Sequence, residues 1–208
     1  MKKLILLLTL SLALVASPLW AKEKLHLKSY EHQGGDFTLT DQFGKPWNLA
    51  KQNKIALIFF GYLNCPDVCP MTLSKMVQVR EMLGPNKDDV LMVLVTLDPE
   101  RDNPKNMKNY LINFDANIVG LTGSLKETTA VAKQYNAVFR KRKLRSALGY
   151  SVVHTGAVYL ADKGGALRFV FPSQSPPERY LQMTEELMKG LGNKPLAKGE
   201  NWLTKLLK

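Results

Sequence analysis

Two unbroken apolar runs dominate the pattern of hydrophobic and polar positions along the chain. Residues 55–60 (IALIFF) and 90–97 (VLMVLVTL) are continuous and rich in β-branched and aromatic side chains. Strands that are buried on both faces of a central sheet have this pattern. We therefore expect two long buried strands here, with a shorter apolar segment at residues 118–121.

Helical periodicity occupies the stretches between and after these runs. Apolar residues recur at helical spacing from Met71 until Gly84, which Pro85 follows. Three more helices are expected at about 104–114, at 124–135, where Ser124 and Glu127 form a capping box, and at 177–189.

Alternating segments predict two hairpins. One, at the start of the domain, joins residues 37–40 to 47–49, and the other joins 156–160 to 166–171 through a glycine-rich turn. Strands that alternate with helices early, followed by a hairpin, indicate an α/β fold with a mixed sheet covered by helices on both faces. This is the element order of a thioredoxin-like domain with an N-terminal hairpin.

The first residues read as a leader. Two lysines precede the apolar run of residues 4–16, and Pro18 interrupts the apolar pattern soon after it. We interpret residues 1–21 as a signal peptide or a membrane anchor. The domain is therefore expected to be exported, and to be periplasmic, either soluble or anchored to the inner membrane. The N-terminal extension, the thioredoxin-like domain and the C-terminal tail are assigned to residues 22–34, 35–192 and 193–208.

Composition narrows the class of protein. The chain has 208 residues, of which 45% are hydrophobic and 23% are charged, so disordered, collagen-like and multi-span membrane proteins are excluded. The formal net charge is +11. Much of the excess lies in one run of five cations, Arg140, Lys141, Arg142, Lys143 and Arg145.

We expect this run to be a solvated loop, because it has little apolar periodicity. The alternative is docking to an acidic partner or to an anionic membrane surface. Nucleic acid is not expected as a partner, since an exported protein rarely meets any and no basic face with interleaved aromatics is visible.

The two cysteines carry the chemistry. Cys65 and Cys69 lie in the segment 61–70 (GYLNCPDVCP), directly after a buried strand, where open α/β sheets commonly place their sites. Pro66 and Pro70 disfavour a helix through the pair, so Pro70 is expected as the first helical residue, with Cys69 as its cap. The helix N-terminus would then favour thiolate over thiol.

The pair has three possible uses: a structural disulfide, redox chemistry and metal binding. A structural disulfide would close a ring of about five residues and contribute only about 2 kcal/mol in the chain-entropy model. Redox chemistry and metal binding both suit two thiolates better. His154 stands at the entrance to an apolar strand and could add an imidazole, whereas His26 and His32 look exposed. Two thiolates and one imidazole suit Cu(I), can hold Cu(II) with an added oxygen ligand, and are chemically compatible with zinc.

These residues resemble the Sco (SenC) family of copper-binding, thioredoxin-fold proteins that assist assembly of the binuclear copper site in cytochrome oxidase. The resemblance covers most of the chain after about residue 35 and rests on residues 61–70, 96–102 (TLDPERD), 154–155, 159–160 and 164–165. It implies that Cys65, Cys69 and His154 are copper ligands, with His154 on a loop that folds toward the cysteines. The implied partners are the copper-bearing subunit of cytochrome c oxidase or another copper acceptor, and a copper donor protein.

The chain departs from the family pattern at two places. Asn64 stands where the family often has His, and Val153 where it often has Asp. The leading hypothesis is a metallochaperone and not a turnover enzyme. The rival is a periplasmic thiol–disulfide oxidoreductase, in which Cys65 and Cys69 cycle between dithiol and disulfide.

Minor roles were assigned to the neighbours of the cysteines. Asp67 and Asp98 are expected to form turns or cap helices, and Arg101 is expected to pair with a neighbouring acid. Met71 is expected to pack into the core at the start of the helix; the alternative is that its thioether is a ligand to Cu(I).

Overall fold

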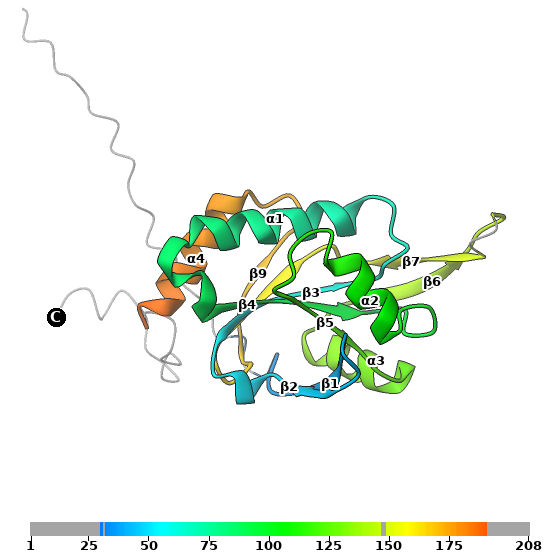
Figure 1. Cartoon of the computed structure of the whole chain (residues 1–208), viewed down its shortest axis with the longest axis horizontal. Coiled ribbons are helices and arrows are strands. Elements are labelled where there is room, and N and C mark those ends of the chain that lie inside the picture. The colour runs from blue at the N-terminus through cyan, green and yellow to red at the C-terminus, as the bar shows by residue number, and fades with distance from the viewer. Residues whose placement is uncertain (1–29, 31, 147–148, 191–208) are drawn as a thin grey trace, which may run out of the picture.

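The computed structural model describes residues 30, 32–146 and 149–190. Seven strands form the main sheet, in the order β2-β1-β5-β4-β3-β8-β9 (Figure 1). Their bounds, in chain order, are β1 Thr38–Asp41, β2 Pro46–Asn48, β3 Ile55–Gly61, β4 Val90–Thr96, β5 Ile118–Thr122, β8 Val158–Ala161 and β9 Leu167–Phe171.

The sheet is mixed. β3 pairs in parallel with β4 and antiparallel with β8, and β4 pairs in parallel with β5. The parallel register runs from Ile55 opposite Val90 to Gly61 opposite Thr96, so β3 and β4 end together at one edge. β1 and β2 form the predicted N-terminal hairpin. The segments that follow β3 and β4 are therefore neighbours in space.

Helices cover both faces of the sheet. They are α1 Val68–Met82, α2 Pro104–Leu111, α3 Leu125–Gln134 and α4 Pro177–Met188, with short 3-10 helices at Ala50–Gln52 and Gly84–Asp89. α1 and α4 lie side by side on one face, and α3 lies on the other (Figure 1). The predicted α/β fold class, a mixed sheet flanked by helices, is confirmed.

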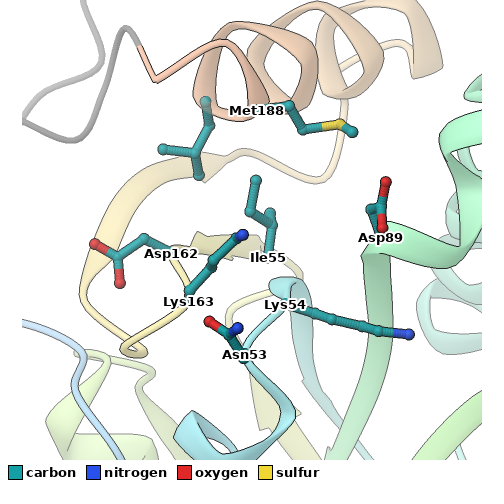
Figure 2. A pocket seen from close by; sticks show the side chains of 8 residues that line it. Asn53, Lys54, Ile55, Asp89, Asp162, Lys163 and Met188 are labelled. Atoms are coloured by element: carbon teal, nitrogen blue, oxygen red, sulfur yellow. The ribbon is translucent and has the colours of Figure 1, made fainter.

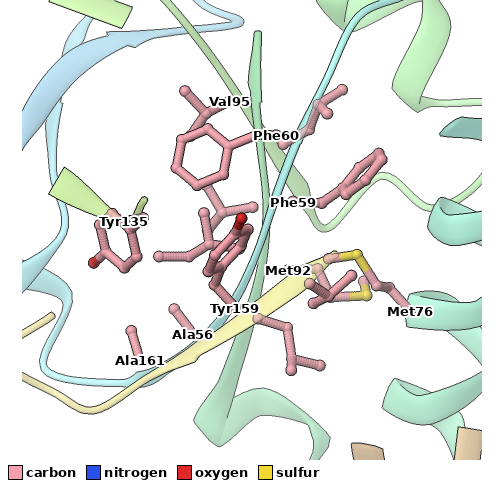
Figure 3. Packing of buried hydrophobic residues seen from close by; sticks show 14 of the residues in the cluster. Ala56, Phe59, Phe60, Met76, Met92, Val95, Tyr135, Tyr159 and Ala161 are labelled. Carbon is pink, nitrogen blue, oxygen red and sulfur yellow. The ribbon is translucent and has the colours of Figure 1, made fainter. Parts of the chain in front are cut away.

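The core explains why the run at β3 is unbroken. Phe59 and Phe60 project to opposite sides of the strand, Phe59 toward Met76 and Phe60 toward Tyr135 (Figure 3). The rings of Phe60 and Tyr135 are 5.8 Å apart between centroids. Because both faces of β3 are covered, every one of its seven residues is buried.

Four of the five cations of the basic run lie in a strand and not in a loop, so the predicted conformation is wrong, although all five are exposed as expected. β6 (Phe139–Lys143) pairs antiparallel with β7 (Tyr150–His154) in a separate two-stranded sheet, the β6–β7 hairpin, which extends away from the main sheet (Figure 1). Val152 of β7 is only 4% exposed, so one face of the hairpin packs against the body of the domain. The apolar partner strand holds the charged strand in place.

The proposed leader, residues 1–21, and the proposed tail, residues 193–208, lie outside the described residues. Among the residues that the structure describes, no helix is long and apolar enough to cross a bilayer.

Candidate metal centre

Cys65 and Cys69 lie between the end of β3 and the first turn of α1. α1 begins at Val68 with Asp67 as its N-cap residue, so Cys69 is inside the first turn and Pro70 is the third helical residue. The prediction that Cys69 caps a helix starting at Pro70 is therefore wrong. Proline fits here because N–H groups of the first turn have no intrahelical acceptor. Cys69 is buried, and Cys65 is half-buried in the loop above it.

His154 reaches the cysteines from the far end of the chain. It is the last residue of β7, a strand and not a loop, and its Nε2 lies 3.5 Å from Cys69 Sγ. The sulfurs of Cys65 and Cys69 and a ring nitrogen of His154 all lie within 4.8 Å of one another. The structure thus brings together all three residues that the sequence singled out.

A backbone contact orients the imidazole. His154 Nδ1 is 3.0 Å from the carbonyl oxygen of Thr155, which can only accept a hydrogen bond, so Nδ1 carries the proton. In the neutral ring this leaves the lone pair on Nε2, the nitrogen that faces Cys69. Phe59 and Tyr62 flank the ring, each at 5.9 Å between centroids. The histidine is therefore held in the tautomer that a metal requires.

The pKa values of the two thiols are shifted in opposite directions. The hydrogen bond from the Cys69 thiol lowers the pKa of Cys65 to about 3 against the opposing effect of burial, with smaller contributions from the neighbouring His154 and from the backbone N–H groups of Asp67 and Cys69. The same bond to Cys65, together with burial, raises the pKa of Cys69. At neutral pH Cys65 is therefore a thiolate that accepts a hydrogen bond from the Cys69 thiol. Metal binding would release the remaining proton, which Cys69 carries.

Gly61 makes room for the buried sulfur. A Cβ on this residue would lie 2.7 Å from Cε1 of Phe59, closer than real Cβ contacts, and 3.0 Å from Cys69 Sγ, tighter than most of them. A side chain here would force Cys69 or Phe59 to move.

A buried carboxylate braces the loop that carries Cys65. Asp102 Oδ2 accepts hydrogen bonds from the backbone N–H of Leu63, at 3.1 Å, and from Thr96 Oγ1, at 2.6 Å. Its Oδ1 is buried without a hydrogen-bond partner among the described residues. Burial raises the pKa of Asp102 to about 6, against these two hydrogen bonds.

A second network ties the hairpin to the turn after β4. Tyr150, the first residue of β7, donates its hydroxyl to the buried Asp98, which also accepts from Arg101 Nε. The Arg101 guanidinium stacks on the Tyr150 ring at 3.8 Å and bonds to the Tyr150 carbonyl. The predicted acid partner of Arg101 is thus Asp98, whereas Asn103 caps α2.

The sequence did not predict some residues of the site and predicted the place of another wrongly. The packing of His154 against Phe59 and Tyr62, and the bracing of the cysteine loop by Asp102, are not predictable from spacing, because only the fold brings these segments together. Met71 is 65% exposed, so the prediction that it packs into the core is wrong. His32 is exposed as expected, and His26 lies outside the described residues.

A pocket at the opposite end of the sheet contains none of these ligands. It has a volume of about 310 Å³ near the start of β3, and Lys54, Lys163, Asp89 and Asp162 surround it (Figure 2). Met188 also lines it and supplies a single soft ligand, a thioether, whereas the cysteine edge gathers two sulfurs and an imidazole, so that edge is the better site for a soft metal.

The arrangement at that edge is suited to a thiophilic metal. Two sulfurs and one nitrogen supply a three-ligand set of the kind that Cu(I) favours, and the half-buried Cys65 leaves one side open for exchange. The same two thiols are close enough in the chain to cycle through a disulfide.

Comparison with known proteins agrees with this picture. A family model described as SCO1/SenC matches residues 26–189. A SCO2-like protein of Rickettsia conorii is 36% identical over 148 residues, which are 70% of this chain and 72% of that protein. Protein sco1 of Schizosaccharomyces pombe is 36% identical over 152 residues, covering 70% of this chain and 57% of that protein.

Solved structures with copper bound share the fold. ScoI of Bradyrhizobium japonicum superposes with a TM-score of 0.67 at 37% identity, covering 74% of this chain and 98% of its own. Yeast Sco1 gives a TM-score of 0.71 at 28% identity, covering 82% of this chain and 97% of its own. Since the family model spans most of the sequence and the fold agrees, this chain belongs to the SCO1/SenC family.

Proposed function

We propose that this chain is a copper metallochaperone that binds copper through Cys65, Cys69 and His154. It would pass the metal by ligand exchange to the binuclear copper site of cytochrome c oxidase during assembly. The copper-bearing subunit of the oxidase, or another copper acceptor, would receive the metal, and a separate donor protein would supply it.

The convergence of three ligand atoms within 4.8 Å carries this proposal. Two thiolates favour Cu(I) over harder ions, and the imidazole is already oriented with its lone pair toward the sulfurs. The copper-bound structures of two relatives support the choice of metal. Both Cu(I) and Cu(II) are included, because an added oxygen ligand would complete a Cu(II) site.

Copper titration of the reduced chain tests the ligand set. His154→Ala is expected to weaken copper binding by at least about 100-fold, the upper end of what the loss of an outer-shell partner costs. His32→Ala is the matched control, since this exposed histidine lies outside the site. Unchanged affinity and stoichiometry in His154→Ala would overturn the three-ligand site.

A thiol–disulfide oxidoreductase is the second candidate. The low pKa of Cys65 favours it, because a thiolate is the attacking species in disulfide exchange. BsSco, a Sco-family protein described with a disulfide switch, is 25% identical at a TM-score of 0.62 and also supports redox chemistry in such a pair. Strong disulfide reductase activity that survives in His154→Ala, without copper binding in the wild type, would favour this function.

We also propose that the domain works outside the cytoplasm. The leader-like residues 1–21 support a periplasmic protein, either soluble or anchored to the inner membrane. Fractionation of cells that express the full chain, followed by N-terminal sequencing, would distinguish cleavage from anchoring.

A further inference from the structure

The cations of β6 do not act as one uniform patch. Successive side chains of a strand point to opposite faces, so Lys141 lies on one face and Arg140 and Arg142 on the other. Lys141 faces the body, where its Nζ lies 2.7 Å from Glu100 Oε2 and 4.5 Å from the Tyr150 ring centroid. Arg140 and Arg142 are exposed and form no ion pair with any residue that the structure describes.

The outward face of the β6–β7 hairpin combines these arginines with valines. Arg140 is directly opposite Val153 across the hairpin, so both side chains lie on this face. Val138 lies two residues before Arg140 and therefore points to the same face. Val138 is 65% exposed and Val153 is 39% exposed. Arginine beside exposed apolar side chains is the composition of a protein-binding surface, where arginine is enriched and lysine is depleted.

This face adjoins the metal centre. Val153 immediately precedes His154, and the cross-strand partner of His154 is Phe139, the residue before Arg140. The side chains of Val153 and His154 point to opposite faces of β7, and the two faces meet at the end of the strand, where the N–H of Thr155 donates a 3.1 Å hydrogen bond to the carbonyl of Val138. A partner that rests on Val138, Arg140, Arg142 and Val153 would therefore reach the imidazole by extending around this end of β7.

We propose that the outer face of the hairpin, formed by Val138, Arg140, Arg142 and Val153, docks the acidic surface of the protein that accepts the metal. The occupant is a protein and not an anionic bilayer, because a bilayer offers no ligand to which a metal held by Cys65, Cys69 and His154 could pass. Carboxylates on the acceptor would pair with the two unpaired guanidinium groups, which are suited to bidentate contacts. The inference rests on the proposed function, since it identifies the acceptor by charge.

Association kinetics test the docking face separately from metal binding. The probe is the purified copper-bearing domain of a cytochrome c oxidase, mixed with the copper-loaded full chain from about 0.01 to 1 M ionic strength. Arg140→Glu combined with Arg142→Glu is expected to slow association by about tenfold or more at low salt and to flatten its salt dependence. Copper affinity, measured alongside, should stay at the wild-type value.

Lys126→Glu combined with Lys133→Glu is the matched control, because it makes the same change of charge on exposed residues of α3. This variant should associate at nearly the wild-type rate. Equal slowing in both double variants, no association in the wild type, or loss of binding only to phosphatidylglycerol vesicles would overturn the docking face. A wild-type chain that associates but binds no copper would contradict the proposed function alone.

Discussion

The hydroxyl of Tyr150 donates a 2.6 Å hydrogen bond to Oδ1 of Asp98, a carboxylate with no exposed surface. This contact joins the first residue of β7 to the turn that follows β4. Because His154 is the last residue of the same strand, the bond fixes one end of the element whose other end supplies the imidazole. Tyr150 is thus a positioning residue for the candidate metal centre.

Tyr150→Phe should loosen the hairpin. The loss of a hydrogen bond to a charged, buried acceptor is expected to lower the free energy of unfolding by about 1.5 to 3 kcal/mol and to weaken copper binding. Denaturant unfolding and copper titration measure the two effects. Tyr180→Phe is the control, since the Tyr180 hydroxyl is buried without a hydrogen-bond partner among the described residues. Equal effects in both variants would remove the positioning role of Tyr150.

Asp102→Asn should change how stability depends on pH. Burial raises the pKa of Asp102 from its ordinary value of 3.8 to about 6 in the folded chain, so folding favours its protonated form. The contribution of Asp102 to the free energy of unfolding is therefore fully present below pH 3.8. About 3 kcal/mol of it is lost as the pH rises from 3.8 to 6.

The amide of Asn can accept the same bonds from Leu63 and Thr96 without a charge. The stability of Asp102→Asn relative to wild type should therefore increase between about pH 4 and pH 6 and level off above it. Unfolding free energies at several pH values measure the difference. A difference that is constant across this window would contradict the raised pKa.

Cys65 should react as a thiolate over the whole neutral range. Because its pKa is lowered to about 3, the rate of alkylation by iodoacetamide should be nearly flat from about pH 5 to 8. An ordinary thiol with a pKa of about 8.5 reacts about tenfold faster for each unit of pH in this range. Mass spectrometry of the modified, metal-free chain identifies the site. If the alkylation rate at Cys65 rises tenfold per pH unit, or if Cys69 is labelled faster than Cys65, the lowered pKa of Cys65 is contradicted.

Gly61→Ala should disturb the buried sulfur. The added methyl group would lie 3.0 Å from Cys69 Sγ, so the variant is expected to lose about 1 to 3 kcal/mol of stability and part of its copper affinity. Gly164→Ala is the matched control, because its Cβ would meet only Asp162 Oδ1, at an ordinary 3.5 Å. Thermal unfolding and copper titration of both variants provide the comparison.

The elements with a strong local signal were predictable from sequence. The continuous apolar runs of β3 and β4 and the capping box of Ser124 and Glu127 all occur in the structure. β6 was not predicted, because four of its five residues are charged and exposed. Its strand conformation comes from pairing with β7, whose Val152 is buried, and such a tertiary cause leaves no mark in the pattern of β6 itself.

The candidate site was predictable to different extents. The cysteine pair follows from its place after a buried strand. The nearness of His154 is not encoded locally. Its place at the entrance to an apolar strand made it a candidate third ligand, and the resemblance to the Sco family implied that it meets the cysteines. The supporting shell of Phe59, Tyr62 and Asp102 could not be found from spacing, since these residues meet the cysteines only through the register of β3 with β4 and the docking of the hairpin.

The separation of the ligands along the chain gives the centre a further property. Cys69 and His154 are 85 residues apart, on the main fold and on a hairpin outside the main sheet. A nascent or partly unfolded chain therefore offers two thiols but no imidazole in place. Retention of a metal by all three ligands would report that folding is complete, and denaturation of the hairpin alone would remove the imidazole and leave the metal on the two thiols, more weakly held.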